Sequence, residues 1–144
     1  MDIKDCVTFA TEHPVCFLAT NDGDQPRVRA VLLFFADEEG FYFVFLSPKD
    51  MVKQLKKNPK VEICFYNNAP DLSAAREMRI TGRMELVHDS ELTKRALKER
   101  GFIEGTIGRP LEPLLEIYRM HTGEGFFWTM NDILKEHELE RIGF

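Results

Sequence analysis

The stretch Pro26-Arg27-Val28-Arg29-Ala30-Val31-Leu32-Leu33-Phe34-Phe35-Ala36 decides the fold, because it predicts a long strand from which a hairpin extends on each side. Successive side chains of an extended strand point to opposite faces. One face of this strand is expected to carry Val28, Ala30, Leu32 and Phe34, and the other Arg27, Arg29, Val31, Leu33 and Phe35. The stretch therefore predicts a strand over about residues 27–36 with two distinct faces.

Turn sequences on both sides of this strand predict two consecutive β-hairpins. Asn21-Asp22-Gly23-Asp24 separates it from the apolar segment 15–20, and Asp37-Glu38-Glu39-Gly40 separates it from the aromatic segment 41–46. Asn, Asp and Gly tolerate the backbone angles of tight turns. We therefore expect an antiparallel meander over residues 15–46.

The remaining segments add strands and short helices to this meander. Strands are expected at 61–66, at 78–87 with a kink at Gly82, and at 125–130. Helices are expected at 2–12, from Ser47 to Asn58, from Ser90 to about Arg100, and at 111–118, while 67–75 and 101–108 are expected to be loops. The charged tail 131–144 receives no assignment. This pattern predicts a small antiparallel β-barrel of α+β class with short helices at its corners.

Length and composition narrow the class of protein. With 144 residues, 44% of them hydrophobic and 30% charged, the chain is expected to form a single domain, residues 1–144. The net charge of −5 argues against a nucleic-acid partner. No apolar stretch is long enough to cross a bilayer and no leader pattern opens the chain, so no membrane partner is expected. Three cysteines without a CxxC motif indicate neither a disulfide framework nor a zinc site, and we expect a soluble, cytoplasmic protein.

A candidate anion site combines two arginines of one strand with the start of the following helix. Arg27 and Arg29 point the same way, and Ser47-Pro48-Lys49 has the residue types of an N-cap and a first helical turn. A helix N-terminus presents unpaired N–H groups and partial positive charge, so these groups together can hold a phosphate. Asp50 counts against this interpretation because its carboxylate competes for the same charge. The alternative is that the arginines form a solvated strand face and Ser47 is only a cap.

Other residues that often carry chemistry are expected to be structural. The four histidines lack metal-ligand spacing, so no metal site is expected. Cys16 and Cys64 lie in apolar strands and are expected in the core, and the run Lys98-Glu99-Arg100 is expected on a solvated helix face. Trp128, after Phe126-Phe127, is a core or interface residue or part of a cofactor wall. No catalytic residue can be named, because no nucleophile or phosphate-loop motif occurs.

Several short motifs resemble those of pyridoxamine 5′-phosphate oxidase-like proteins. In chain order they are Phe17-Leu18-Ala19-Thr20-Asn21-Asp22-Gly23, Pro26 to Leu33, Gly40-Phe41-Tyr42-Phe43, Lys53 to Glu62, and Met78-Arg79-Ile80-Thr81-Gly82. Each motif is modest alone, but their order and spacing match over roughly residues 10–90. The chain is most similar to the short stand-alone members, which include the nitroimidazole-resistance-like proteins.

This resemblance implies a six-stranded antiparallel split β-barrel that forms a homodimer and binds FMN in two clefts at the subunit interface. The high content of twelve phenylalanines also favours a dimer, because one small barrel hides this much aromatic surface poorly. By position, the cofactor-binding residues implied are Arg29 on the phosphate, Ala30, Val31 and Leu32 along the flavin, Val44 and Phe45 on the next strand, Ser47, Lys49, Met51 and Gln54 around the ribityl phosphate, and Trp128 near the partner's flavin.

The function implied is that of an FMN-dependent oxidoreductase that passes electrons between a donor, such as NAD(P)H, and a small molecule. Relatives commonly have threonine at the position of Phe45 and basic residues at those of Asp50 and Met51, so fewer contacts to the phosphate are expected here. The tail lacks the basic groups that a vitamin B6 phosphate requires, so that oxidase activity is not expected. The alternatives are a non-catalytic flavin, deazaflavin or haem binding or sensing protein of the same fold, and an interaction protein whose cleft is empty.

Overall fold

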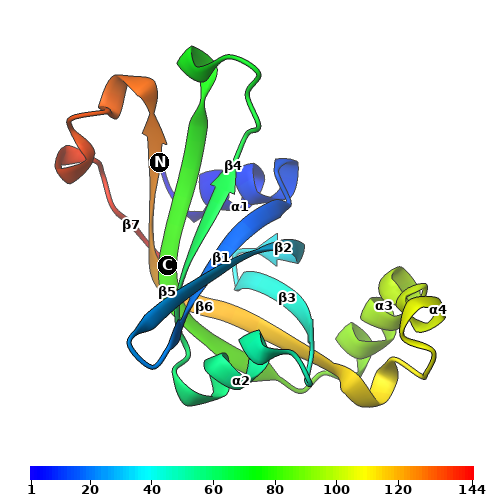
Figure 1. The fold of residues 1–144 in the computed structure, drawn as a ribbon. Coiled ribbons are helices and arrows are strands. Elements are labelled where there is room, and N and C mark those ends of the chain that lie inside the picture. Colours follow the sequence, from blue (N-terminus) through cyan, green and yellow to red (C-terminus); the bar gives the residue numbers. More distant parts are fainter.

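The computed structural model describes residues 1–144 and has an antiparallel β-barrel at its centre (Figure 1). Its strands are β1 (Val15–Asp22), β2 (Gln25–Asp37), β3 (Gly40–Leu46), β4 (Lys60–Tyr66), β5 (Arg76–Val87), β6 (Leu115–Thr129) and the short β7 (Ile142–Gly143). Neighbouring strands follow the order β3-β2-β1-β4-β5-β6-β7, and an additional pairing of β3 with β6 closes a barrel of six strands. The expected six-stranded α+β barrel is confirmed.

Four short helices surround the barrel. They are α1 (Ile3–Glu12), α2 (Asp50–Lys57), α3 (Ser90–Arg100) and α4 (Ile103–Ile107). Helix α1 packs against β2 and β5, and α2 packs against β1. Helices α3 and α4 extend to one side of the barrel, at the right of Figure 1. None of the four has the length and apolar character needed to cross a membrane.

Phenylalanines fill the interior of the barrel. Phe41 and Phe43 of β3 and Phe65 of β4 are completely buried, in one cluster with Leu18 of β1 and Met78 of β5. Because aromatic side chains bury a large area each, a few of them close the centre of a barrel of this size. The barrel is therefore a packed core rather than a channel.

The two faces predicted for β2 hold up to Leu33 and then change at a β-bulge. Leu33 pairs with Phe43, but the next pair is Phe35 with Tyr42, so Phe34 is an extra residue. A bulge of this kind re-aims the side chains that follow it. Phe35 stacks on Tyr42 with ring centroids 4.2 Å apart, within the outer cluster that contacts α3. The prediction that Phe35 shares a face with Leu33 is therefore wrong, and the bulge is the reason.

The helix predicted at 111–118 is also wrong. The structure has only a single 3-10 turn there, Glu112–Leu114, and β6 begins directly after it. Strand β6 pairs with β3 on one edge and with β5 on the other, and it is 15 residues long rather than the six predicted. Two open strand edges outweigh the local helical spacing of the leucines, because pairing with both edges closes the barrel.

Smaller differences occur elsewhere. The predicted loop 101–108 contains α4, and the unassigned tail adds β7 to the edge of β6. The kink predicted at Gly82 is confirmed by a register shift between Gly82 and Met84. A Cβ atom on Gly82 would lie 2.6 Å from the backbone oxygen of Thr122, so this close approach of β5 and β6 requires glycine.

Candidate functional site

The site begins with a separation between two neighbouring strands of the barrel. β2 and β3 pair from the turn only as far as Leu33 and Phe43. Beyond this point β2 remains paired with β1, and β3 remains paired with β6 as far as Leu46. The facing edges of residues 30–32 and 44–46 therefore lack a strand partner. Backbone N–H and C=O groups on such open edges are available to a ligand.

A cleft of about 240 Å³ occupies this separation. It is lined by Ala30, Val31 and Leu32 of β2, Val44, Phe45 and Leu46 of β3, and Lys49, Arg100, Ile103 and Leu111. Six of the residues expected at the cofactor are thus brought together in one place. The lining is apolar except for two cationic side chains, and it contains no carboxylate. Such a surface suits a flat, largely apolar molecule that carries negative charge.

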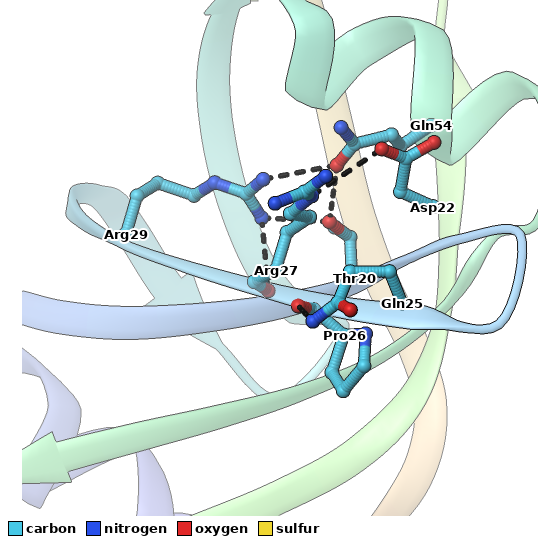
Figure 2. Close-up of polar contacts among 7 residues, drawn as sticks. All are labelled: Thr20, Asp22, Gln25, Pro26, Arg27, Arg29 and Gln54. Atoms are coloured by element: carbon cyan, nitrogen blue, oxygen red, sulfur yellow. Dashed lines mark hydrogen bonds and ion pairs between the residues drawn. The ribbon is translucent and has the colours of Figure 1, made fainter.

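Arg29 lies directly before this lining in the chain, and its side chain is held by neutral groups (Figure 2). Its Nη1 donates to the Thr20 hydroxyl at 2.7 Å, and its Nη2 donates to Gln54 Oε1 at 2.9 Å. Nη1 also lies 3.3 Å from the backbone oxygen of Leu18 and 3.4 Å from that of Arg27. Arg29 therefore bridges β2, β1 and α2 rather than extending into bulk water.

The charge of Arg29 has no carboxylate partner. Burial, and to a lesser degree the neighbouring Arg27 guanidinium, lowers the pKa of Arg29 from its ordinary value. Arginine nevertheless stays protonated at neutral pH. Buried charges are normally paired with an opposite charge, and the partly buried guanidinium of Arg29 has only neutral partners. The uncompensated charge of Arg29 therefore favours binding of an anion next to its side chain.

The start of α2 differs from the sequence prediction. Lys49, not Ser47, is the N-cap residue, and no side chain caps the helix. The Ser47 amide donates to the Leu114 backbone oxygen at 2.8 Å, which fixes this residue to the entry of β6 instead. The backbone N–H groups of Asp50 and Met51 have no acceptor within the chain. They are free donors at the positive end of the helix dipole.

The side chains at the beginning of α2 are oriented in different directions. The Met51 side chain is buried in the core, so only its backbone can meet a ligand. Asp50 is exposed, and its carboxylate lies 3.9 Å from Lys53 Nζ. Trp128 is half-buried on β6, where it pairs with Glu77 of β5, and it does not line the cleft of its own chain.

Sequence reasoning missed two residues of this site. In the sequence, Thr20 stands out only as part of a motif, although a hydroxyl in the inward alternation of Cys16 and Leu18 is a signal for a specific role. Arg100 was expected on a solvated helix face, but it lines the cleft, and burial lowers its pKa from the ordinary value. Its position depends on how α3 packs against the barrel, which no local pattern reveals.

Comparison with known proteins agrees with the family that the sequence motifs resemble. A family model described as pyridoxamine 5′-phosphate oxidase matches residues 3–128. A pyridoxine/pyridoxamine 5′-phosphate oxidase of Aliarcobacter butzleri is 34% identical over 85 residues, which are 58% of this chain and 38% of that protein. The chain thus spans well under half the length of this curated relative.

Solved structures share the fold. A NimC/NimA family protein of Clostridium acetobutylicum has a TM-score of 0.75 and 28% identity, with 98% of this chain and 91% of that chain covered. General Stress Protein 26 of Bacillus anthracis has a TM-score of 0.73 and 14% identity over 100% of both chains. HutZ, the haem storage protein of Vibrio cholerae, has a TM-score of 0.64 and 17% identity, with 90% and 95% covered. The last two show the fold alone. Because the family model spans nearly the whole chain and the barrel agrees with it, this chain belongs to the pyridoxamine 5′-phosphate oxidase family.

Proposed function

We propose that this chain is an FMN-dependent oxidoreductase that works as a homodimer, with the flavin in the cleft between β2 and β3. The observation that carries the proposal is the Arg29 guanidinium, which has only neutral partners and directly precedes a cleft without carboxylates. A phosphate monoester is the anion that such a guanidinium binds well, since arginine donates to two of its oxygens at once.

The residues present fit FMN at both of its ends. Arg29, Lys49 and the free N–H groups of Asp50 and Met51 would hold the phosphate. The apolar residues of β2 and β3 would lie along the ring, and their open backbone edges would meet its polar atoms. When bound, FMN supplies the redox chemistry, and the chain supplies binding, orientation and exclusion of water. This division of labour explains the lack of an acid, base or nucleophile in the cleft.

The outer face of β1 and β2 supports a second subunit. Val28 is 69% exposed, Val15 50%, Leu32 45% and Phe17 42%, and Val15 pairs directly with Leu32 across the two strands. A contiguous apolar face of this kind marks an interface. Leu32 belongs both to this face and to the cleft lining, so a subunit that covers the face would also close the cleft.

The size of the cleft supports the same arrangement. One chain provides about 240 Å³, whereas sites for ligands of cofactor size enclose at least about 300 Å³. A second copy would supply the missing wall. We place Trp128 in that wall, because it lies on β6 outside the cleft of its own chain.

The proposed substrate is a small redox-active molecule, with NAD(P)H as a candidate electron donor. Lys49 and Arg100 line the cleft and no carboxylate lines it, which favours anionic molecules. Haem is disfavoured as the ligand, because this chain places no histidine, cysteine, methionine or tyrosine in the cleft to serve as an axial ligand. The three cysteines are free thiols, as is usual in the proposed cytoplasmic location.

Spectroscopy of the purified protein tests the proposal. We expect flavin absorbance bands after incubation with FMN and removal of free ligand, and bleaching of these bands by NADH or NADPH without oxygen. Retained flavin that no donor reduces would instead identify a binding protein. Failure to retain FMN, together with a light-scattering mass of one chain, would contradict both the cofactor and the dimer.

A further inference from the structure

Thr20 is the only buried residue outside the hydrophobic and glycine classes. It is 2% exposed and lies on β1, where its side chain follows those of Cys16 and Leu18 into the barrel. A buried hydroxyl requires hydrogen-bond partners. Here it donates to Gln54 Oε1 at 2.6 Å and accepts from Arg29 Nη1 at 2.7 Å. The hydroxyl therefore joins the strand to the helix and to the arginine.

These contacts occupy one particular edge of the Arg29 guanidinium. A guanidinium has five N–H donors in a rigid plane, which form an end edge of Nη1 and Nη2 and a side edge of Nη2 and Nε. Thr20 Oγ1 and Gln54 Oε1 lie 2.6 Å apart and accept from Nη1 and Nη2 respectively, so together they occupy the end edge. No hydrogen bond within the chain uses Nε (Figure 2).

We infer that Thr20 is a positioning residue of the anion site, which fixes the end edge of Arg29 so that the side edge presents Nε–H and one Nη2–H to an oxyanion. The ligand chemistry is a phosphate monoester, two of whose terminal oxygens match this edge. The inference rests on the proposed FMN site and adds a residue that does not itself touch the ligand. Its physical basis is preorganisation, since a flexible arginine otherwise loses side-chain freedom on binding.

Riboflavin separates this role from a general effect on the fold, because it has the flavin ring but no phosphate. In Thr20→Val the shape is kept and the hydroxyl is lost. We expect the dissociation constant for FMN to rise at least about fivefold, as a buried donor and acceptor lose their partner. Affinity for riboflavin should stay within about twofold. Thr20→Ser, which keeps the hydroxyl, should restore FMN binding.

Two comparisons make the test specific. Thr81→Val changes a strand threonine on β5 whose hydroxyl contacts only the Glu124 backbone oxygen, and it should leave FMN affinity unchanged. In an Arg29→Ala background, Thr20→Val should cause no additional loss, because residues that act through one contact are not additive. Equal weakening of FMN and riboflavin by Thr20→Val, or unchanged FMN affinity, would overturn the inference.

A measurement on the unaltered protein covers the case in which Thr20→Val does not fold. The Arg29 Nε–H resonance, identified in NMR spectra by its loss in Arg29→Lys, should shift when FMN binds and not when riboflavin binds. An unmoved resonance in an FMN complex would overturn the free-edge geometry. If the unaltered protein binds FMN no better than riboflavin, the phosphate site itself fails, which distinguishes failure of the proposed function from failure of the role of Thr20.

Discussion

Arg27 and Arg29 lie two residues apart on the same face of β2, yet only Arg27 has a carboxylate partner. Arg27 Nε lies 3.3 Å from Asp22 Oδ2 in the β1–β2 hairpin, whereas Arg29 contacts the Thr20 hydroxyl and the Gln54 amide oxygen. The hairpin thus satisfies one arginine locally. Arg29 instead reaches α2, where no carboxylate compensates its charge, so Arg29 is the arginine available to an anion.

Arg29→Ala is expected to weaken FMN binding by at least about tenfold, or about 1.4 kcal/mol, because a charge-assisted contact to the phosphate is lost. Fluorescence titration measures this change, and riboflavin affinity should not follow it. Arg27→Ala is the matched control, since its charge is paired with Asp22 and its loss should change FMN affinity little. Equal effects of the two substitutions would remove Arg29 from the site.

Val28→Glu is expected to convert a dimer to single chains, because it places a charge within the apolar face of β1 and β2, where Val28 is the most exposed of the apolar side chains. Light scattering should give a molar mass of two chains for the unaltered protein and of one chain for the variant, with weaker FMN retention. Leu134→Glu makes the same change at a side chain that is 85% exposed in the C-terminal segment, and it should leave the mass unchanged. A single-chain mass for the unaltered protein would count against the proposed closed cleft.

Asp50→Arg is expected to tighten FMN binding. It exchanges an exposed negative charge at the first turn of α2 for a positive one beside two free N–H groups. Interactions of this kind contribute about 0.3–1 kcal/mol each, so affinity should rise several-fold and the gain should shrink with added salt. Glu39→Arg makes the same charge change at the β2–β3 turn, at the other end of these strands, and should have a smaller effect. Equal gains would mean that net charge, rather than the helix start, is responsible.

The stability of the protein is expected to fall as the pH rises above about 9. Burial, with a smaller contribution from Cys64, raises the pKa of the Cys16 thiol to about 12 from an ordinary value of 9.0. Between these values the unfolded chain has released a proton that the folded chain retains, so folding loses free energy with increasing pH. The loss is about 1.4 kcal/mol per pH unit for one thiol.

Denaturant unfolding at pH 9 and pH 10 tests this assignment. Cys16→Ala removes one titrating thiol, so its free energy of unfolding should fall less steeply over this interval than that of the unaltered protein. The remaining buried thiols still contribute, since the pKa of Cys6 is raised to about 11 and that of Cys64 to about 12, in both cases mainly by burial. Identical slopes for the two proteins would contradict the raised pKa of Cys16.

Local sequence signals were sufficient for most of the barrel and for part of the site. Turn residues and alternating side chains located β1, β2 and β3, and the motif around Arg29 led to the family. Local signals were insufficient where contacts with distant parts of the chain override the local preference of a segment. Residues 111–118 have leucines at helical spacing, but residues 115–118 are strand because they pair with both β3 and β5. Ser47 has the chemistry of an N-cap, but its amide bonds to Leu114 and the helix starts later.

The amino-acid sequence by itself determined the alternation of β2, the hairpins on both sides of it, and the presence of arginine at position 29, because each depends on residues close together in the chain. Only the tertiary structure decided that β2 and β3 separate into a cleft, that Arg100 of α3 lines it, and that Thr20 and Gln54 hold one edge of Arg29. These relationships join residues from different strands and helices, and barrel closure, rather than any local preference, brings them within hydrogen-bonding and packing distance.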